Sequence, residues 1–495
     1  MKPSRLSIVG VTFLIGSAAH FCMAQKAGSF TPAGNTNVAR RGHTTTLLTN
    51  GSVLIAGGWA VPESSGGSLA SAEAFDPSTG SFSFTGSMAT SRRYHTATLL
   101  ADGRVLIAGG SNSMNPALSS AELYDPANGT FAPTGSMAVA RSSHMAVLLG
   151  NGKVLIAGGL NPVNCSPCPA VLTSAELYDP GAGTFTPTGD MISPSYEVNT
   201  PFLLPNGNVF IGGGLNSQVY DPETGRFTAT GGWYAVADDW PDSQTMLLNG
   251  SVLVTGGDPD GFGASAFAGV YDPAKGIFSK TSHMNAPRDL HTSTLLPDGK
   301  ALIVGGQLTG GASVGSAEIY DPANGTFDVA GNMITPRCCH TATLLNSGRV
   351  LIVGGVSAAT GYPTYQPVSA LAAELYNPTK VIVGPDLFGF PGSGNAQGAI
   401  WDAFTGQPAS ADAPASAGAI LSLYTAGLTS GATISPQVVL GGGLAEVLFF
   451  GDAPGFPGYY QVNFRVPEGV PSGLAVPLRL VYLGRWSNAV TIALR

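Results

Sequence analysis

The sequence predicts an all-β protein: a seven-bladed β-propeller closed by its N-terminal strand, followed by a small immunoglobulin-like β-sandwich. Three observations predict this fold. A unit of about fifty residues recurs seven times. The closing element of the seventh unit stands at the front of the chain, and the residues after Pro378 form short runs of alternating apolar and polar side chains.

Each unit contains four segments that predict strands. It reads R-x-x-H-T-x-x-L-L-x-x-G-x-V-L-I-x-G-G, then a variable loop, then S-A-E-L-Y-D-P and G-T-F-x-x-T-G-x-M. The unbroken Val-Leu-Ile run predicts a second strand buried on both faces, and Asp-Pro predicts the turn from the third strand to the fourth. Four short strands per repeat are typical of a propeller blade. The Gly-Gly pairs begin at Gly57, Gly109, Gly158, Gly213, Gly256, Gly305 and Gly354.

The Gly-x-Phe closing element predicts how the ring shuts. It follows six of the seven units but is missing after Pro378, and a copy stands instead at Gly28–Gly34. The N-terminal strand should therefore complete the last blade, because an open ring would leave two unpaired strand edges.

The chain divides into three predicted parts. Lys2 and Arg5, the apolar run Leu6–Ala19 and the small residues up to Ala24 predict a signal peptide over residues 1–24, since the run is too short to cross a bilayer. Lipidation at Cys22 is the alternative. The propeller is expected over residues 25–379 and the sandwich over residues 380–495, and the protein is expected to be secreted, or to lie in the periplasm or at the cell surface.

The composition limits the classes of partner. The net charge is −8, only 11% of residues are charged, and no basic tract occurs. These features argue against nucleic acid and anionic membranes as partners. No other segment is long and apolar enough to span a membrane. We expect a monomeric protein whose partner is an extracellular glycan or protein.

The repeat resembles the kelch repeat over residues 27–378. The resemblance rests on Gly-Gly after an apolar strand, a Tyr further on and then a bulky aromatic residue, although kelch repeats usually carry Trp where this chain carries Phe. It implies a kelch-type propeller but no particular function, because that fold serves binding proteins, scaffolds and enzymes.

Three repeat positions vary together and predict a bonded set. Arg, His and Glu occur in five units, as in Arg92, His95 and Glu122. Because the three are lost together, we expect Glu to accept hydrogen bonds from Arg, His or both, and Arg92, His95 and Glu122 to form a structural cluster. A histidine metal site is the alternative. The other members are Arg40/His43/Glu73, Arg141/His144/Glu176, Arg288/His291/Glu318 and Arg337/His340/Glu374; blade four has Tyr196, Asn199 and Gln218, and blade five has Asp239, Asp242 and Gly269.

The two irregular blades predict a candidate ligand site. The loops between second and third strands should lie on the same face as the loops that join successive blades, and in several blades they are long. On that face blades four and five place acids and tryptophans, which could bind sugar rings or Ca²⁺. A degenerate repeat with solvated acids is the alternative. The candidates are Trp233, Asp238, Asp239, Trp240 and Asp242 for ligand binding and Asp258 and Asp260 for a metal.

Four cysteines follow the signal peptide. Cys165 and Cys168 predict a disulfide across one loop if the protein is exported. The alternative is a metal site formed by these two cysteines together with Cys338, Cys339 and His340.

The C-terminal region predicts a sandwich of six or seven short strands. Tyr460, Val462, Phe464 and Val466 alternate with polar residues, as in a half-buried strand. The run Gly458–Gly473 with Ser487–Ile492 resembles an uncharacterised C-terminal domain of secreted acidobacterial proteins, which implies a spacer, attachment or stabilising module.

Two functions remain at this point. We expect a non-catalytic protein that binds a glycan or protein ligand, without a cofactor or with calcium. The alternative is a radical-copper oxidase, because galactose oxidase and its relatives also join a kelch-type propeller to a C-terminal sandwich, and Tyr94-His95 is similar to their copper-ligand pair. That family takes a further His from its C-terminal domain, whereas no His follows His340 here, so copper is not expected.

Overall fold

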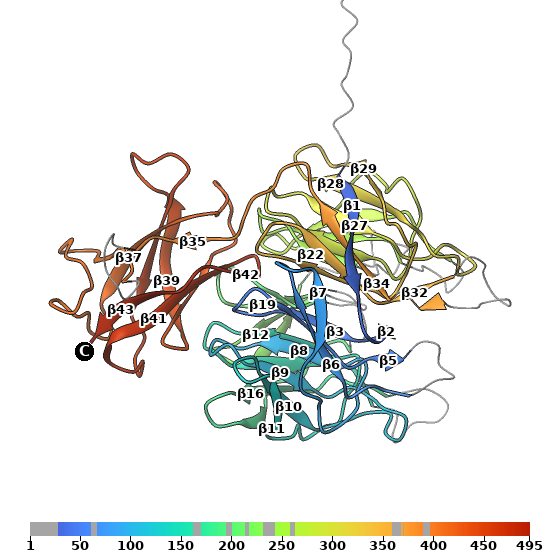
Figure 1. Cartoon of the computed structure of the whole chain (residues 1–495), viewed down its shortest axis with the longest axis horizontal. Helices are drawn as coiled ribbons and strands as arrows, with labels where there is room; N and C mark the ends of the chain where they lie inside the picture. Colours follow the sequence, from blue (N-terminus) through green and yellow to red (C-terminus); the bar gives the residue numbers. More distant parts are fainter. Residues whose placement is uncertain are drawn as a thin grey trace, which may run out of the picture.

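The computed structural model describes residues 28–60, 67–161, 170–194, 200–212, 217–230, 243–257, 263–358, 368–369, 371–389 and 397–495. Every element in these ranges is a β-strand, and the strands form a seven-bladed propeller and a separate C-terminal sandwich (Figure 1). The all-β fold expected from the sequence is confirmed. No helix in the described ranges is long and apolar enough to cross a membrane.

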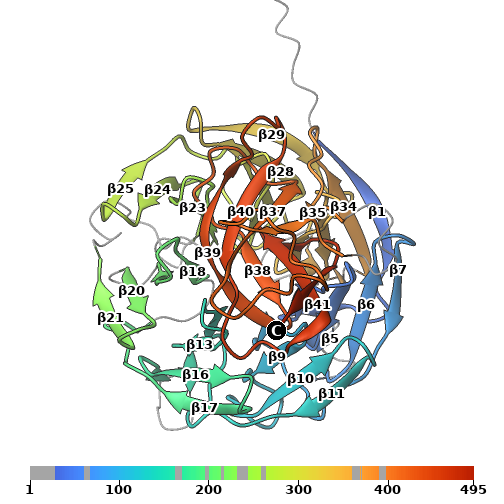
Figure 2. The ribbon, with the colours of Figure 1, turned by 90° about the vertical axis from the view of Figure 1, so that its left-hand side faces the viewer.

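Seven antiparallel sheets of four strands are arranged in a ring (Figure 2). From the innermost strand outward, the first three blades are β3 (Thr44–Leu47), β4 (Val53–Ala56), β6 (Ala72–Asp76) and β7 (Ser81–Phe84); β8 (Thr96–Leu99), β9 (Val105–Ala108), β10 (Ala121–Asp125) and β11 (Thr130–Pro133); and β12 (Met145–Leu148), β13 (Val154–Ala157), β16 (Ala175–Asp179) and β17 (Thr184–Pro187). Blades four and five are β18 (Phe202–Leu203), β19 (Val209–Ile211), β20 (Gln218–Asp221) and β21 (Arg226–Ala229); and β22 (Ser243–Met246), β23 (Val252–Thr255), β24 (Ala268–Asp272) and β25 (Ile277–Lys280). Blade six is β26 (Thr292–Leu295), β27 (Ala301–Val304), β28 (Ser316–Asp321) and β29 (Thr326–Asn332).

The seventh blade joins the two ends of the propeller sequence. Its strands are β30 (Thr341–Leu344), β31 (Val350–Val353), β34 (Ala372–Asn377) and, outermost, β1 (Ser29–Asn35). β1 pairs with β34 so that Phe30 lies opposite Tyr376, the register that Phe131 and Tyr124 have in blade two. The N-terminal strand therefore closes the ring, as the displaced Gly-x-Phe element predicts.

Apolar contacts between blades form the core of the ring. The Val-Leu-Ile strands are fully buried, and the repeated Tyr or Phe of the third strand packs on the Phe of the fourth. The Tyr124 hydroxyl also lies 2.9 Å from Thr85 Oγ1, which follows the outer strand of blade one. Each aromatic pair thus fills the space between blades and binds to the neighbour, because a buried hydroxyl needs a hydrogen-bond partner.

The C-terminal domain is a two-layered sandwich around one apolar core. β39 is long and pairs with β40 in one layer and with β38 in the other. Leu423 and Phe464 of the first layer and Leu440 and Leu478 of the second are buried in this core. The strands are β35 (Asp386–Leu387), β36 (Ile400–Asp402), β37 (Ile420–Ala426), β38 (Gln437–Leu440), β39 (Gly443–Asp452), β40 (Tyr460–Arg465), β41 (Gly473–Tyr482), β42 (Arg485–Trp486) and β43 (Val490–Leu494). These are more strands than the sequence predicts, since β35 and β42 are too short for an alternating pattern.

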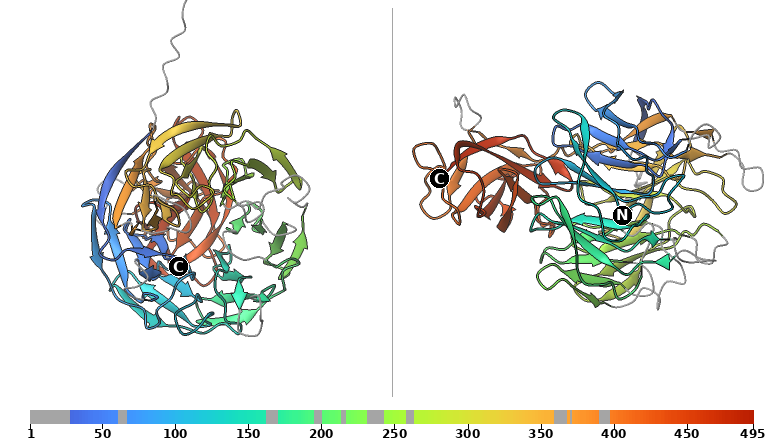
Figure 3. Two further views of the ribbon diagram at one scale, coloured as in Figure 1. Left: turned by 90° about the vertical axis from the view of Figure 1, so that its right-hand side faces the viewer. Right: turned by 90° about the horizontal axis from the view of Figure 1, so that it is seen from below.

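The sandwich covers one end of the propeller channel (Figures 2 and 3). It contacts the hairpins between first and second strands: Arg479 Nη1 donates to the Thr49 carbonyl at 3.3 Å, Thr433 N to that of Leu248 at 2.8 Å, and Trp486 N to Asn346 Oδ1 at 3.2 Å. A cavity of about 490 Å³ inside the channel is lined by the inner strands and by Val481, Leu483 and Trp486 of the sandwich. The other end of the channel is therefore the face on which loops can meet a ligand.

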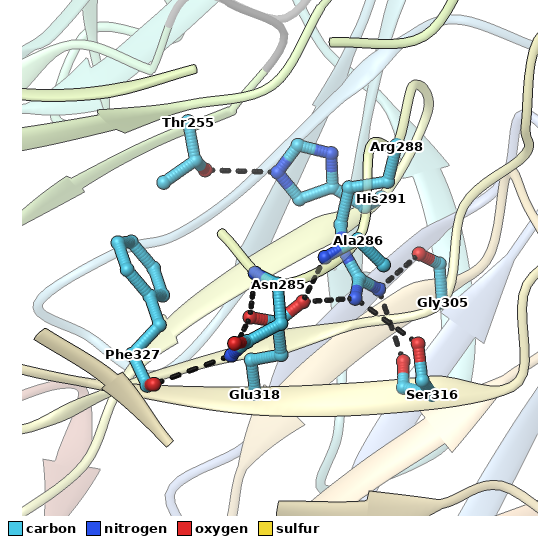
Figure 4. Close-up of polar contacts among 9 residues, drawn as sticks. All are labelled: Thr255, Asn285, Ala286, Arg288, His291, Gly305, Ser316, Glu318 and Phe327. Atoms are coloured by element: carbon cyan, nitrogen blue, oxygen red, sulfur yellow. Dashed lines mark hydrogen bonds and ion pairs between the residues drawn. The ribbon is translucent and has the colours of Figure 1, made fainter. Parts of the chain in front are cut away.

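A buried ion pair anchors the start of each regular blade. In blade two, Arg92 Nη2 lies 2.9 Å from Glu122 Oε1, and both side chains are almost fully buried. Glu122 also accepts hydrogen bonds from the backbone N–H groups of Ala89 and Thr90, in the segment that arrives from blade one. Arg92 Nη1 donates to the Gly109 and Ser120 carbonyls. The same pair occurs in four other blades, Arg40–Glu73 at 2.6 Å, Arg141–Glu176 at 3.1 Å, Arg288–Glu318 at 2.7 Å and Arg337–Glu374 at 2.7 Å (Figure 4 shows blade six).

The histidines belong to a different contact, which corrects the expected three-residue cluster. His95 Nε2 lies 3.0 Å from Thr44 Oγ1 on the innermost strand of the preceding blade, rather than against Glu122. His144 makes the same contact with Thr96. His291 reaches Thr255 at the end of β23, because β22 of blade five begins with Ser243 instead of Thr (Figure 4). Arg and Glu hold a blade to its incoming segment, whereas His ties neighbouring blades together.

The Gly-Gly pair makes room for this arrangement. Gly57 has φ 62°, and a Cβ there would lie 2.5 Å from the Arg92 carbonyl and 2.8 Å from His95 Cε1. Gly58 N donates to the same Arg92 carbonyl at 2.8 Å. The pair is glycine because both the backbone conformation and the approach of the next blade exclude a side chain.

Blades four and five replace the ion pair by neutral packing. Gln218 takes the place of Glu, is buried, accepts from Ile192 N at 2.8 Å and donates to the Ser193 carbonyl at 3.0 Å. Gly269 takes that place in blade five, and the Phe278 ring lies where a Cβ would project. A buried carboxylate without its arginine would be strongly unfavourable, so a neutral group or an apolar ring is found instead.

Replacing Glu122 by Ala should destabilise the propeller by about 3–5 kcal/mol, because the buried Arg92 charge and two backbone donors lose their acceptor. The free energy of unfolding from chemical denaturation measures this. The double variant Arg92→Met/Glu122→Gln, which carries no charge, should lose less than Glu122→Ala alone. A loss below about 1 kcal/mol for Glu122→Ala would contradict the proposed anchoring role.

The five buried histidines should make the protein unstable in mild acid. Burial, reinforced by nearby arginines, lowers the pKa of His144 from 6.5 to about 3, lowers those of His43 and His340 to about 3, and lowers those of His95 and His291 well below 6.5. Below pH 6.5 the unfolded chain then binds protons that the folded chain does not, so stability present above that pH is lost as the pH falls toward 3.

Each histidine should contribute about 1.4 kcal/mol per pH unit to this loss. Denaturation curves between pH 8 and pH 5 measure it. His144→Asn should reduce the slope between pH 6 and pH 5 by about one proton. Stability that stays constant from pH 7 to pH 5 would show that the histidines are protonated in the folded protein.

Candidate functional site

The candidate site is a rim of residues around the open end of the channel. These are the two residues between Arg and His of each regular blade, which lie just before the innermost strand and so at the end opposite the C-terminal domain (Figures 1 and 3). The rim residues are Arg41 and Gly42, Arg93 and Tyr94, Ser142 and Ser143, Asp289 and Leu290, and Cys338 and Cys339.

The second residue of each rim pair has an unusual backbone conformation. Tyr94, Ser143, Leu290 and Cys339 have φ between 50° and 58°, in the left-handed region that favours glycine, and Gly42 has φ 60° at the same position. Backbone hydrogen bonds link them from blade to blade, from Tyr94 N to the Gly42 carbonyl at 3.0 Å and from Ser143 N to the Tyr94 carbonyl at 2.9 Å. Non-glycine residues in this conformation carry strain, and such residues cluster at functional sites.

The first residue of each rim pair forms a short bridge with the segment after Gly-Gly. Arg41 in β2 (Arg40–Arg41) pairs with Trp59 in β5 (Trp59–Ala60), and Ser142 bridges Leu160. The other short ribbons on this face are β14 (Leu160–Asn161) with β15 (Ala170–Val171) and β32 (Val356–Ser357) with β33 (Val368–Ser369). The long loops between second and third strands thus begin and end next to the rim, as the sequence predicts for the ligand face.

One part of the rim combines cationic and aromatic groups. The Arg93 guanidinium lies 3.9 Å from the centre of the Trp59 ring and 5.3 Å from that of Tyr94. Tyr94 is 43% exposed and its ring covers Gly42. Such a cation–π stack holds the rings and the guanidinium in a fixed arrangement that a ligand can contact.

Another part of the rim carries two adjacent thiols. Cys338 and Cys339 are unbonded, with their Sγ atoms 3.4 Å apart. The contact with Cys339 and burial raise the pKa of the Cys338 thiol, whereas the contact with Cys338 and the nearby Arg41 charge lower the pKa of the Cys339 thiol. Asp289 lies nearby and accepts a hydrogen bond from Gln307 Nε2 at 3.1 Å.

The acidic and aromatic residues singled out in blades four and five lie outside the described ranges. These are Trp233, Asp238, Asp239, Trp240, Asp242, Asp258 and Asp260, and the Cys165–Cys168 pair lies outside them as well. Described strands flank them: β21 ends at Ala229, β22 begins at Ser243, and Gly257 donates to the Arg288 carbonyl.

Among the described residues, no three His, Cys, Asp or Glu side chains come together as a metal site. The histidines of the regular blades direct Nε2 at a threonine, and His340 does so with Thr292 at 3.0 Å. Tyr94 and His95 are adjacent, but Tyr94 lies at the rim while His95 is buried between blades. The described donors therefore do not fit a copper ion held by Tyr94 and His95.

The rim was missed by the sequence analysis, although the sequence carries a signal for it. Within the constant Arg-x-x-His motif, no two regular blades have the same pair of central residues. The left-handed conformation that makes the second of them special leaves no mark on residue type, because Tyr, Ser, Leu and Cys all adopt it here.

Comparisons with known proteins agree with the fold. The family model described as "Kelch motif" matches residues 40–89 and 92–138. A solved structure, titled a novel fungal alcohol oxidase with catalytic diversity among the AA5 family in complex with copper, is similar with a TM-score of 0.63 and 17% sequence identity over 94% of this chain and 100% of that chain. A search of curated proteins finds no match.

At that identity the solved structure supports the fold alone. The matched motif covers blades one and two, and the same ion pair, Gly-Gly turn and aromatic pair recur in the later regular blades. Ser29 to Asn377 therefore form a kelch-repeat β-propeller.

Proposed function

We propose that this protein is a secreted, non-catalytic binding protein that holds an extracellular glycan or protein ligand on the rim face of its propeller. One observation carries the proposal. The ring repeats a constant framework of Arg, Glu, His and Gly-Gly, while the residues that this framework projects around the open channel differ from blade to blade.

A varied surface on a rigid, repeated frame is the usual arrangement of a recognition site in repeat proteins. The left-handed backbone of Tyr94, Ser143, Leu290 and Cys339 supports the same conclusion. Strained backbone conformations of this kind are kept mainly where a particular side-chain direction is needed. The rim face also lies at the end of the propeller opposite the C-terminal domain (Figure 1).

The chemistry of the rim favours a ligand with acidic and hydroxyl groups. Arg41 and Arg93 supply guanidinium groups, Trp59 and Tyr94 supply ring surface, and Ser143 supplies a hydroxyl. Arginine beside aromatic rings suits a carboxylate on a sugar or on a protein side chain. Export of the chain, inferred from residues 1–24, is part of this proposal.

Tyr94→Gly should weaken ligand binding about ten-fold while leaving stability equal or slightly higher, because glycine adopts the left-handed conformation without strain. Gly42 at the equivalent position of blade one shows that the ring accepts this residue. Arg93→Ala should weaken binding similarly. Binding is measured with the ligand obtained from a glycan array or from purified extracellular proteins.

Phe84→Ala is the matched control, since Phe84 is an exposed aromatic residue on the outer strand β7, 59% exposed. It should bind as the unchanged protein does. Ligand binding that survives both Tyr94→Gly and Arg93→Ala in folded protein would place the ligand elsewhere.

We also propose that the acidic segment 232–242 and the loop 258–261 contribute to this face, as a calcium or sugar site. The flanking strands β21, β22 and β23 support this, since the corresponding connections of the regular blades lead to the rim. Calorimetry with Ca²⁺ tests it: Asp239→Asn/Asp258→Asn should reduce the affinity about ten-fold or more if the carboxylates bind the ion. Equal affinity in a folded double variant would eliminate the site.

The second candidate is a copper-dependent oxidase. The similar fold of the copper-containing alcohol oxidase favours it, and the use of His95 between blades disfavours it. Copper content of the purified protein, together with alcohol-dependent oxygen uptake, distinguishes the candidates. One copper per chain with oxygen uptake would replace the binding proposal.

A further inference from the structure

The C-terminal sandwich carries a second concave surface, remote from the rim. A pocket of about 770 Å³ lies on the outer side of the layer formed by β36, β37 and β40, within the range of about 300–1,000 Å³ usual for small-ligand sites. Its lining includes the aromatic residues Phe388, Trp401, Tyr424, Phe456 and Tyr459. We propose that this pocket binds a neutral oligosaccharide.

Strand register places the pocket residues on one face. Trp401 of β36 lies opposite Ser422 of β37, and Ser422 lies opposite Asn463 of β40. Tyr424 lies opposite Gln461 in the next row. Because side chains alternate along a strand, these residues project outward while their neighbours Leu421, Leu423, Val462 and Phe464 fill the sandwich core.

The aromatic rings of the pocket are packed in pairs, and two of them are well exposed to solvent. Trp401 and Tyr424 pack edge to face with ring centres 5.5 Å apart, as do Phe388 and Tyr459 at 5.4 Å. Phe456 is 62% and Tyr459 44% exposed. Edge-to-face pairs hold the rings rigidly, so ring surface is available to the apolar face of a sugar at little entropic cost.

Two polar side chains of the lining, Ser422 and Gln461, both bond to the neighbouring Asn463. Asn463 Oδ1 accepts hydrogen bonds from Ser422 Oγ at 2.8 Å and from Gln461 Nε2 at 2.9 Å. This orientation leaves the Gln461 Oε1 acceptor, which belongs to the pocket lining, without a partner among the described residues. An amide group fixed in direction matches the hydroxyl groups of a sugar.

The charge of the pocket argues for a neutral ligand. Among the described residues, no Lys, Arg or His lines it, and the one carboxylate that does, Asp402, accepts hydrogen bonds from Phe404 N at 3.0 Å and Thr405 N at 2.8 Å in its own turn. An anionic glycan would find no cation there, and a cationic peptide would find a carboxylate already engaged. Rings together with amides therefore favour a neutral oligosaccharide over a charged ligand or a purely apolar partner.

Binding of neutral hexasaccharides to the full-length mature protein tests the proposal. Calorimetry with cellohexaose, xylohexaose, mannohexaose and laminarihexaose should detect binding of at least one, while an oligoglucuronate should not bind the pocket. Trp401→Ala and Tyr424→Ala should each weaken that binding about ten-fold or more, a factor equivalent to losing one ring contact. Gln461→Ala should weaken it about three- to ten-fold without disturbing the aromatic pair.

Phe404→Ala serves as the matched control, because Phe404 is an aromatic residue of the same domain that is 81% exposed and does not line the pocket. It should change the affinity less than about two-fold. Since Trp401→Ala removes a packed ring, Trp401→Phe and the melting temperature of each variant separate a folding defect from loss of the site.

Three results would overturn the proposal. None of the four hexasaccharides binds at millimolar concentration; they bind but the Tyr424 and Gln461 variants retain full affinity; or the pocket binds decaproline or a second copy of the chain in place of sugars. The rim proposal is unaffected by these outcomes, because Tyr94→Gly and Arg93→Ala alter only the propeller.

Discussion

The buried arginine–glutamate pair is the interaction on which the regular blades depend. Glu122 fixes the incoming backbone at Ala89 and Thr90, and Arg92 joins that carboxylate to the carbonyl groups of Gly109 and Ser120. The Arg92 carbonyl in turn accepts from Gly58 of the preceding blade. One ion pair therefore fixes a blade relative to its entry segment and to the preceding blade. Because Arg93 and Tyr94 directly follow Arg92, the pair also fixes where these two residues lie.

The irregular blades show why the pair is kept or lost as a unit. A carboxylate at position 218 without an arginine would be a buried, uncompensated charge, and Gln218 avoids this while keeping hydrogen bonds to the Ile192 N–H and the Ser193 carbonyl. Blade five removes the polar group altogether and fills its place with the Phe278 ring, which stacks on Phe267. Both solutions keep an uncompensated charge out of the buried position.

Much of the fold follows from the sequence because repetition makes the pattern unambiguous. The displaced Gly-x-Phe at Phe30 predicts the pairing with Tyr376, and the co-variation of Arg and Glu predicts their ion pair. The histidine contact is not predictable in the same way, since its partner Thr44 lies in another blade and threonine occurs at several positions of each repeat. The sandwich strands β35 and β42 owe their pairing to long-range contacts rather than to a local pattern. At the candidate site, the residues chosen for their charge lie outside the described ranges, and the rim depends on a backbone conformation that residue types do not reveal.

The division between framework and rim has a consequence for how function is distributed in this molecule. The repeated Arg, Glu and His side chains are all engaged in contacts within and between blades. These titratable groups, the most numerous in the repeat, therefore have a structural role. Arg93 and Asp289 stand in the rim pairs, and no two regular blades have the same pair of residues there. In a ring of this kind the ligand specificity can change through single substitutions of rim residues, with little loss of stability. A catalytic centre built from the framework side chains would require several blades to lose their Arg–Glu and His–Thr contacts together. Only blades four and five lack the Arg–Glu pair, and they are adjacent in the ring.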